Sequence, residues 1–185
     1  MDIHETIRTR RSVRRFRPDP IPKEALERLL EAFRWAPSWV NLQPWELVVV
    51  DDPAVKERLA ECVPATNPGR KAVSGAPLVL AVCGRAGRSG LHDGKPVTMH
   101  GDWVMFDLGI ACQTLCLAAW AEGLGTLHLG WLDHAAAGAV LGLSDGTACY
   151  ELIPIGVPEK PSRDPGRRAL SELVHHNRFG APWAR

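Results

Sequence analysis

The first residues of the chain combine a helical hydrophobic pattern with arginines. Residues 2–5 hold two acidic side chains at capping-box spacing, which predicts a short helix at the start of the chain. Ile3 and Ile7 are its apolar positions, and the same face continues to Arg10 and Arg14. Because a stripe that begins with core residues ends in arginine, we expect Arg10 and Arg14 to point inward.

The rest of the pattern alternates between helical and strand periods. No internal repeat and no obvious linker interrupts it, so we expect a single α+β domain over residues 1–185. Residues 84–101 show neither period, and a loop of that length is typically functional or mobile. Helices are expected from Pro22 to Phe33, around Val55 and Leu59, at 101–124, from Asp133 to Gly142 and at 170–176, and strands at 46–50, 78–83, 126–131 and 148–157.

The helix expected at 101–124 is apolar on nearly all sides. Such a helix must be covered all around. A domain of 185 residues can cover one helix of this kind, but a second subunit would help, so we infer a homodimer. The most apolar run, residues 107–121, is too short and too polar for us to expect a membrane span.

Composition narrows the class of protein. With 45% hydrophobic and 23% charged residues, the chain is typical of a soluble globular protein. Its five cysteines form no C-x-x-C pair and no metal-ligand spacing, so we expect a reducing compartment and no metal site. The N-terminus is polar and carries no apolar signal segment, which favours a cytoplasmic location.

Residues 8–17 contain six arginines. They could form a solvated basic face, a nucleic-acid contact or a site for one phosphate. A net charge of only +1 disfavours nucleic acid, since binders of that class usually carry a basic excess over the whole domain. Ser12 favours phosphate, because a hydroxyl between arginines suits a phosphate oxygen. A distant basic pair, Arg167-Arg168, would let one phosphate be held from both ends of the chain.

The segment between Pro37 and Pro44 concentrates aromatic and amide side chains. It could be a simple connector punctuated by prolines, but this composition is more typical of a pocket lining. The chain has no P-loop, no nucleophile elbow and no H-E-x-x-H motif. An enzyme built on this sequence would therefore need a cofactor to supply the chemistry.

Several motifs, taken in order, resemble the nitroreductase family, and together they cover nearly the whole chain. The motifs are Arg10-Arg11-Ser12-x-Arg14, Ala36-Pro37-Ser38-x-x-Asn41-x-Gln43-Pro44-Trp45, Asp107-x-Gly109-Ile110-Ala111-Cys112-Gln113, Gly123-Leu124-Gly125, Ile153-Pro154-Ile155-Gly156-Val157-Pro158 and Arg167-Arg168-x-Leu170-x-Glu172-Leu173-Val174.

This resemblance implies an FMN-dependent NAD(P)H oxidoreductase that reduces nitroaromatics, quinones or similar acceptors by a ping-pong hydride transfer. The implied fold is a central, mostly antiparallel sheet flanked by helices, with a long buried helix at the interface of an intertwined homodimer. FMN would bind non-covalently at that interface and carry the chemistry, so no side chain is expected to act as a catalytic acid or base.

The resemblance also implies where FMN would be held. Arg10, Ser12 and Arg14 would hold its phosphate and ribityl end, and Arg11 would add backbone or side-chain contacts. Arg167 and Arg168 match the C-terminal phosphate-binding pair of the family.

Three further segments would surround the flavin ring. Pro37, Ser38 and Trp39 would come from the partner subunit and pack along the ring, with Asn41 and Gln43 shaping that loop. Asn67 and Lys71 would lie near the pyrimidine edge, with their spacing off by about one residue from the family pattern. Leu129 and Gly130 would place backbone near flavin N5.

Two departures from the family pattern leave the acceptor open. The segment between Gly84 and Gly101 is shorter than the helical insertion of many relatives, and Trp39 and Trp131 are bulky enough to narrow the cleft. Other flavin chemistry, such as reductive dehalogenation or flavin fragmentation, therefore stays an alternative. A non-enzymatic nucleic-acid-binding module is the alternative from another class.

Overall fold

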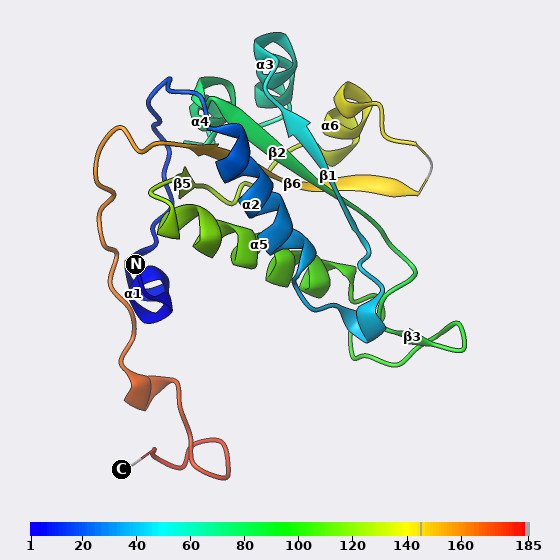
Figure 1. The fold of residues 1–185 in the computed structure, drawn as a ribbon. Coiled ribbons are helices and arrows are strands. Elements are labelled where there is room, and N and C mark those ends of the chain that lie inside the picture. Colours follow the sequence, from blue (N-terminus) through cyan, green and yellow to red (C-terminus); the bar gives the residue numbers. More distant parts are fainter. Residues whose placement is uncertain (145, 184–185) are drawn as a thin grey trace.

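The computed structural model describes residues 1–144 and 146–183 as helices and strands around one central sheet (Figure 1). The helices are α1 Ile3–Thr9, α2 Lys23–Arg34, η1 Trp39–Asn41, α3 Pro53–Glu61, α4 Arg70–Gly75, α5 Val104–Ala121, α6 His134–Leu141 and η2 Leu170–Glu172. The strands are β1 Trp45–Val50, β2 Leu78–Arg85, β3 Leu91–His92, β4 Lys95–Pro96, β5 Gly125–Thr126 and β6 Thr147–Gly156.

The main sheet has four strands in the order β1-β2-β6-β5, and all neighbours are antiparallel. This confirms the expected α+β fold with a mostly antiparallel sheet. A register shift between Val82 and Cys83, which pair with Glu151 and Cys149, marks a bulge in β6. The extra residue is Tyr150, next to Glu151.

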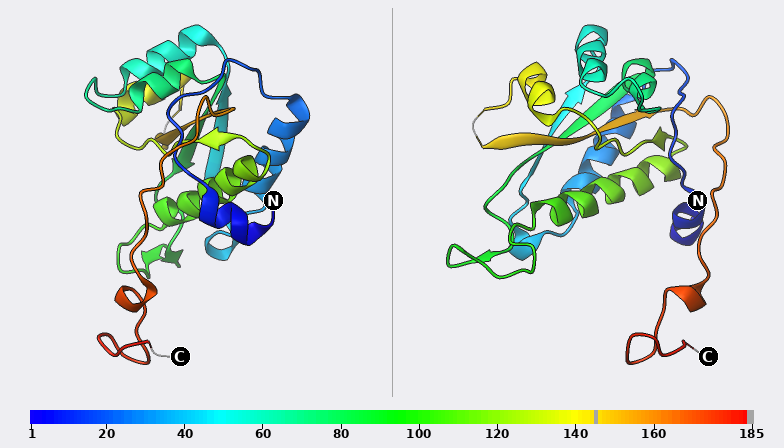
Figure 2. Two further views of the ribbon diagram at one scale, coloured as in Figure 1. Left: turned by 90° about the vertical axis from the view of Figure 1, so that its left-hand side faces the viewer. Right: turned by 180° about the vertical axis from the view of Figure 1, so that it is seen from behind.

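Helices cover both faces of the sheet and form two hydrophobic cores (Figures 1 and 2). Alternate residues of β2 serve the two cores, as the period of a strand requires: Leu80 and Val82 face α2 and α5, whereas Val79 and Ala81 face α3, α4 and α6. A fully buried β2 explains the unbroken apolar run in its sequence.

Helix α5 has one covered and one uncovered face. Its inner residues, such as Leu108 and Leu115, are buried against α2 and the sheet, whereas Met105 and Phe106 are 63% and 55% exposed. With 18 residues and a mean hydropathy of 1.6, the helix is long and apolar enough to cross a membrane. The expectation that this run is too short and too polar for a span was therefore wrong on both length and composition. Its packed inner face is that of a core helix.

The first helix differs from its sequence prediction. Asp2 caps it by accepting from the Glu5 N–H at 2.9 Å, as expected, but Ile3 and Ile7 are each 58% exposed and Thr6 is the buried residue. The helix ends at Thr9, so Arg10 and Arg14 do not continue a helical face. The apolar spacing was read correctly, but that face is turned away from the core of this chain.

Helix ends elsewhere follow local chemistry. Asp133 accepts from the Ala136 N–H at 2.9 Å and begins α6, and Gly142 ends it in the left-handed conformation. Helix α4 was not expected, because residues 70–71 are charged, yet Ala72 and Val73 are buried.

Three further expectations were wrong in detail. The strand expected at 126–131 contracts to β5 and an isolated bridge between Leu129 and Leu152. The long loop from residue 84 carries the small hairpin β3–β4. The last helix is only the short η2, because residues 159–183 leave the body of the domain as an extended arm that packs on little of it (Figure 2).

Candidate functional site

Arg10 lies at the end of α1, half-buried, where the backbone turns extended. Its Nη1 atom is the one buried side-chain nitrogen or oxygen in residues 1–144 and 146–183 that has no hydrogen-bond partner. Leaving a buried donor of a charged group unpaired costs about 1–3 kcal/mol or more, so such atoms need an explanation. An anion bound at Arg10 would satisfy it.

Arg11, the next residue, is fully engaged within the chain. Its guanidinium lies 2.5 Å from an Asp164 carboxylate oxygen and donates to the carbonyls of Arg8 at 2.7 Å and Arg10 at 2.9 Å. The Gly166 N–H, Arg11 and Arg167 together hold the pKa of Asp164 below its usual range. Arg11 therefore pins the C-terminal arm to residues 8–11, and its side chain is not free for a ligand contact.

Ser12 and Arg14 open onto a basic cavity of about 490 Å³. Ser12 pairs with Thr126 of β5 in a parallel bridge, which fixes this segment along the sheet. The opposite wall comes from residues after β6 that the sequence prediction did not include. The polar residues around the cavity are Ser12, Arg14, Arg15, Lys160, Ser162 and Arg163.

Arg167 and Arg168 differ in their partners. Arg168 donates to a Glu172 carboxylate oxygen at 3.0 Å and to the Glu172 carbonyl at 2.9 Å. Arg167 reaches only its neighbouring carbonyl at Gly166 and lines a small cavity with Arg8 and Arg11. Among the described residues, Arg168 therefore has a carboxylate at ion-pair distance and Arg167 has none. The structure does not bring either residue into the cavity lined by Ser12 and Arg14.

The segment from Pro37 to Gln43 is held in an unusual shape. Val40, Asn41 and Gln43 have positive φ angles of 39°, 58° and 49°, a region that β-branched residues such as valine rarely adopt. The Ser38 hydroxyl accepts from the Gln43 N–H at 2.9 Å, and the Gln43 amide donates to the Asn41 side chain at 3.2 Å. Hydrogen bonds of Asn41 and Gln43 therefore help to hold this loop in shape.

A buried carboxylate anchors the same loop to α5. Asp107 is 1% exposed, accepts from the Trp39 N–H at 3.0 Å and accepts from the Ser89 hydroxyl at 2.5 Å. The Trp39 ring lies 6.2 Å from that of Trp103, which in turn lies 4.6 Å from Phe106. Sequence reasoning quoted Asp107 as part of a motif but assigned it no role. A single acid within an apolar helical run was the available signal.

The loop and the helix α1 that precedes Arg10 lie at opposite ends of α5 (Figure 1). Asp107, which holds Trp39, is in the first turn of the helix, and Trp120, which donates to the Thr9 hydroxyl at 2.9 Å, is in the last turn. These residues are thirteen positions apart, or about 20 Å at 1.5 Å per residue. Within one chain, Pro37–Trp39 therefore cannot share a site with Arg10.

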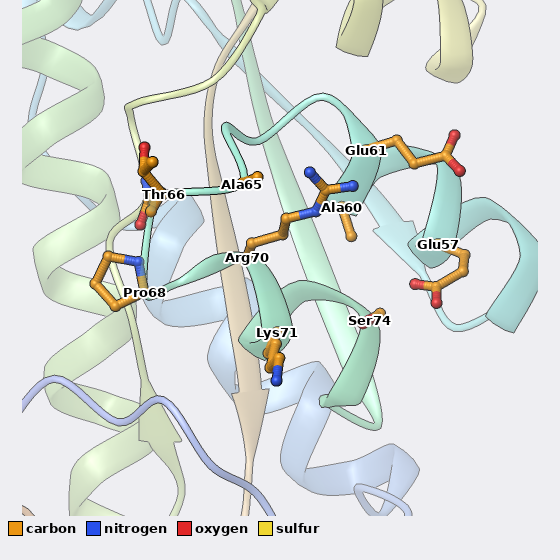
Figure 3. Close-up of a pocket in the computed structure, with 10 residues that line it drawn as sticks. Glu57, Ala60, Glu61, Ala65, Thr66, Pro68, Arg70, Lys71 and Ser74 are labelled. Atoms are coloured by element: carbon orange, nitrogen blue, oxygen red, sulfur yellow. The ribbon is translucent and has the colours of Figure 1, made fainter.

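Asn67 and Lys71 line one cavity of about 490 Å³ between α3 and α4 (Figure 3). The Asn67 side chain accepts from the Gly69 N–H at 2.8 Å and donates to the Trp131 carbonyl at 3.3 Å. It thus ties the start of α4 to the Leu129–Trp131 segment. In Figure 3, Arg70 reaches across toward α3, and it donates to the carbonyl of Val63, just after the end of that helix, at 3.2 Å.

Leu129 and Gly130 stand side by side but differ in exposure. Leu129 is buried and exchanges two backbone hydrogen bonds with Leu152, at 3.1 and 3.0 Å. Gly130 is exposed, and its N–H has no acceptor within the described part of the chain. A backbone donor held by a rigid neighbour and open to solvent can bind an acceptor atom of a ligand.

A histidine–glutamate pair supports this segment. The His128 Nδ1 atom lies 3.0 and 3.3 Å from the two Glu151 carboxylate oxygens. Hydrogen bonding to Cys116 and Glu151 raises the pKa of His128 to about 10, so the imidazole is protonated at neutral pH. Sequence reasoning missed this pair, because the two residues are far apart in the chain and meet only through the Leu129–Leu152 bridge.

These groups fit a mononucleotide. The orphaned Arg10 donor suits a phosphate, and the free Gly130 N–H suits a ring acceptor. An extended backbone from Thr126, beside Ser12, to Gly130 spans at most about 13 Å, which leaves room for a ribityl chain between the two groups. In residues 1–144 and 146–183, no group of three or more His, Cys, Asp or Glu side chains is placed to hold a metal ion.

Comparison with known proteins agrees with the geometry. A family model described as "Nitroreductase family" matches residues 7–157. The chain is 30% identical to an NADH dehydrogenase of Thermus thermophilus, over 94% of this chain and 95% of that protein. It is 34% identical to the 5,6-dimethylbenzimidazole synthase of Rhodobacter capsulatus, over 85% of this chain and 84% of the synthase.

Solved structures share the fold. A protein from Exiguobacterium sibiricum in complex with FMN has a TM-score of 0.82 and 22% identity, over 96% of this chain and 98% of that one. Fold, motif order and family match point the same way. The chain belongs to the nitroreductase family.

Proposed function

We propose that the protein is an FMN-dependent oxidoreductase that uses NAD(P)H to reduce nitroaromatics, quinones or similar acceptors by a ping-pong hydride transfer. The buried, unpartnered Nη1 of Arg10 carries the proposal, because an anion bound at the end of α1 would satisfy this donor. Relatives that share most of the chain support the nucleotide chemistry. The family and the near-neutral net charge disfavour a nucleic-acid-binding module.

The residues of this chain would bind and orient the cofactor. Bound FMN supplies the hydride-accepting ring, and no side chain need act as an acid or base. Arg10, Ser12 and Arg14 would hold the phosphate and ribityl end, with Arg167 as the second cation from the C-terminal arm. The Gly130 N–H would donate to the ring at the N5 side, where negative charge develops on reduction.

A homodimer would complete the site. Because Pro37–Trp39 lies about 20 Å from Arg10 along α5, the loop can reach a flavin only in a second copy of the chain. The uncovered face of α5, with Met105, Phe106 and Ile110, forms an apolar groove of about 510 Å³ that a second subunit would cover.

Exposed apolar side chains of α1 and the C-terminal arm, Ile3, Ile7, Leu170, Leu173 and Phe179, are further surface that a second subunit could cover. We place such a soluble dimer in the cytoplasm.

The test of the cofactor is retention of flavin by the purified protein. We expect the visible absorption of oxidised FMN, bleached by NADH or NADPH and restored by a quinone or nitroaromatic acceptor. Arg10→Gln should weaken FMN binding about 10- to 100-fold, the worth of one or two charge-assisted hydrogen bonds. Arg28→Gln, which removes an equal charge on α2, is the matched control. A protein that binds no FMN when it is added contradicts the proposal.

The dimer has a separate test. Ile110→Asp places a charge in the middle of the uncovered α5 face, where burial would require it to lose its hydration. Sedimentation equilibrium should show a dimer for the wild type and a monomer for the variant, which should also lose FMN. A wild-type monomer that binds FMN tightly would contradict the shared site.

A second candidate is the synthesis of 5,6-dimethylbenzimidazole, whose dimethylbenzene ring is also part of flavin. The 34% identity to the Rhodobacter capsulatus synthase favours it. Chromatography of the small molecules released from the reduced protein in air separates the two functions. Intact FMN after many turnovers with an added acceptor supports the reductase, and release of dimethylbenzimidazole supports the synthase.

A further inference from the structure

The basic cavity onto which Ser12 and Arg14 of the proposed phosphate site open is built from two chain segments that run side by side. The Ser162 hydroxyl donates to the Ser12 carbonyl at 3.3 Å, and the Glu159 N–H donates to the Arg15 carbonyl at 3.1 Å. Phe16 and Pro158 form an antiparallel bridge at one end. The cavity of about 490 Å³ therefore has a defined backbone frame rather than resting on loose side chains.

Its charge is unbalanced. Arg14, Arg15, Lys160 and Arg163 line the cavity, and no carboxylate of residues 1–144 and 146–183 does. None of the four has an ion pair or a side-chain hydrogen bond to the part of the chain that the structure describes. Four cations around one cavity repel one another, and a bound anion relieves that repulsion.

One FMN phosphate does not account for all of this charge. A phosphomonoester carries about −1.5 to −2 at pH 7. In the proposed function, Arg10 and Arg14 already match that charge, and Arg167 is available from the C-terminal arm. Arg15, Lys160 and Arg163 remain, so the cavity has cations for a second dianionic group.

We propose that Arg15, Lys160 and Arg163 bind the 2′-phosphate of NADPH and make NADPH the preferred reductant. The inference rests on the proposed function, because the reductant must lie against the flavin whose phosphate is next to this cavity. The flavin ring would lie near Gly130, up to about 13 Å from Ser12, so the nicotinamide end is far from the cavity and the phosphorylated ribose can reach it. Guanidinium forks suit a phosphomonoester, and NADH lacks that group.

The experiment compares reductants on the FMN-loaded protein. We expect the wild type to have a kcat/KM for NADPH at least tenfold above that for NADH. The double variant Lys160→Gln/Arg163→Gln should lose most of this ratio, mainly through KM for NADPH, and leave NADH oxidation within about twofold. Arg58→Gln, which removes a distant exposed charge on α3, is the control and should change neither value.

A binding measurement distinguishes recognition of a 2′-phosphate from recognition of a 5′-phosphate. Calorimetry on the FMN-loaded protein should detect adenosine 2′,5′-bisphosphate and show at least tenfold weaker binding in the double variant. Adenosine 5′-monophosphate should bind weakly to both proteins.

Two outcomes overturn the inference while leaving the proposed function standing. In one, the wild type binds FMN but uses NADH and NADPH equally. In the other, the double variant loses FMN affinity with an unchanged NADPH-to-NADH ratio, so that the cavity belongs to the flavin phosphate. A wild type that binds no FMN instead contradicts the proposed function itself.

Discussion

Arginines on two parts of the molecule are treated in opposite ways. On α2, Arg28 reaches both Glu122 carboxylate oxygens, at 2.8 and 2.6 Å, and Arg34 reaches Glu31 at 2.7 Å. On the segment after α1, Arg11 and Arg17 have carboxylate partners, whereas Arg14 and Arg15 meet no carboxylate in residues 1–144 and 146–183. Arg10 has a buried nitrogen with no partner there. The same residue type is thus neutralised throughout one region and only in part in the other.

The difference separates charges that support the fold from charges kept for a ligand. A paired surface arginine contributes little to stability, about 0–1 kcal/mol, and its loss matters little. An unpaired arginine that is half-buried is a net cost until an anion arrives. The contrast predicts which substitutions change stability and which change only binding.

The largest effect is expected at Asp107, a buried acidic side chain that accepts two hydrogen bonds. Asp107→Ala leaves the Trp39 N–H and the Ser89 hydroxyl without their acceptor, which should lower the free energy of unfolding by about 3–5 kcal/mol. Asp107→Asn keeps an acceptor for Trp39 and should cost less. Urea denaturation of the apoprotein measures both, and equal small losses would show that the carboxylate is not an anchor.

Adjacent arginines give a sharper version of the comparison. Arg11→Ala breaks the contact with Asp164 and two carbonyl hydrogen bonds, so we expect a loss of about 1–2 kcal/mol in the free energy of unfolding. Arg10→Ala should leave the stability of the apoprotein nearly unchanged, because it removes an unsatisfied donor. For FMN affinity we expect the reverse: Arg10→Ala should weaken it more than Arg11→Ala does. A destabilised Arg10 variant with normal FMN affinity would contradict it.

Another effect depends on pH. The pKa of His128 is raised to about 10 by Cys116 and Glu151, above its unfolded value of about 6.5. The pair therefore stabilises the fold fully below pH 6.5, and this contribution is lost as the pH rises toward 10. Glu151→Gln should flatten the decline in stability between pH 7 and 10, measured by urea denaturation. An unchanged pH profile would show that Glu151 does not stabilise the imidazolium.

The smallest effect is expected on α2. Arg28→Ala removes an exposed pair with Glu122 and should leave both the stability of the fold and FMN affinity nearly unchanged, because both partners stay hydrated when separated. Urea denaturation measures the stability. A clear destabilisation would mean that paired surface arginines are more important here than the comparison assumes.

Sequence patterns predicted those elements of the fold whose burial is decided within the chain. The unbroken apolar run of β2 and the Asp133 cap of α6 were both interpreted correctly. Ile3 and Ile7 were not, because a period of 3.6 identifies an apolar face but not whether that face meets the core. The end of the chain was overpredicted as helix, because local propensity was not supported by packing.

The candidate site divides in the same way. Arg10 and Ser12 could be found because the motif is contiguous, although the helical phase given for Arg10 was wrong. Lys160 and Arg163 could not, since they flank Pro161 in an aperiodic segment and meet Ser12 only through the fold. His128 and Glu151 required a cross-strand contact that no local pattern encodes.

The left-handed Val40 has a consequence for anyone engineering this protein. A valine at φ 39° costs about 1–3 kcal/mol, so replacing it with glycine or asparagine is an accessible thermostabilising change. Selection for heat resistance alone would favour that change and relax the loop that presents Trp39. Directed evolution for stability at Val40 would therefore raise the melting temperature but leave the loop less rigidly shaped.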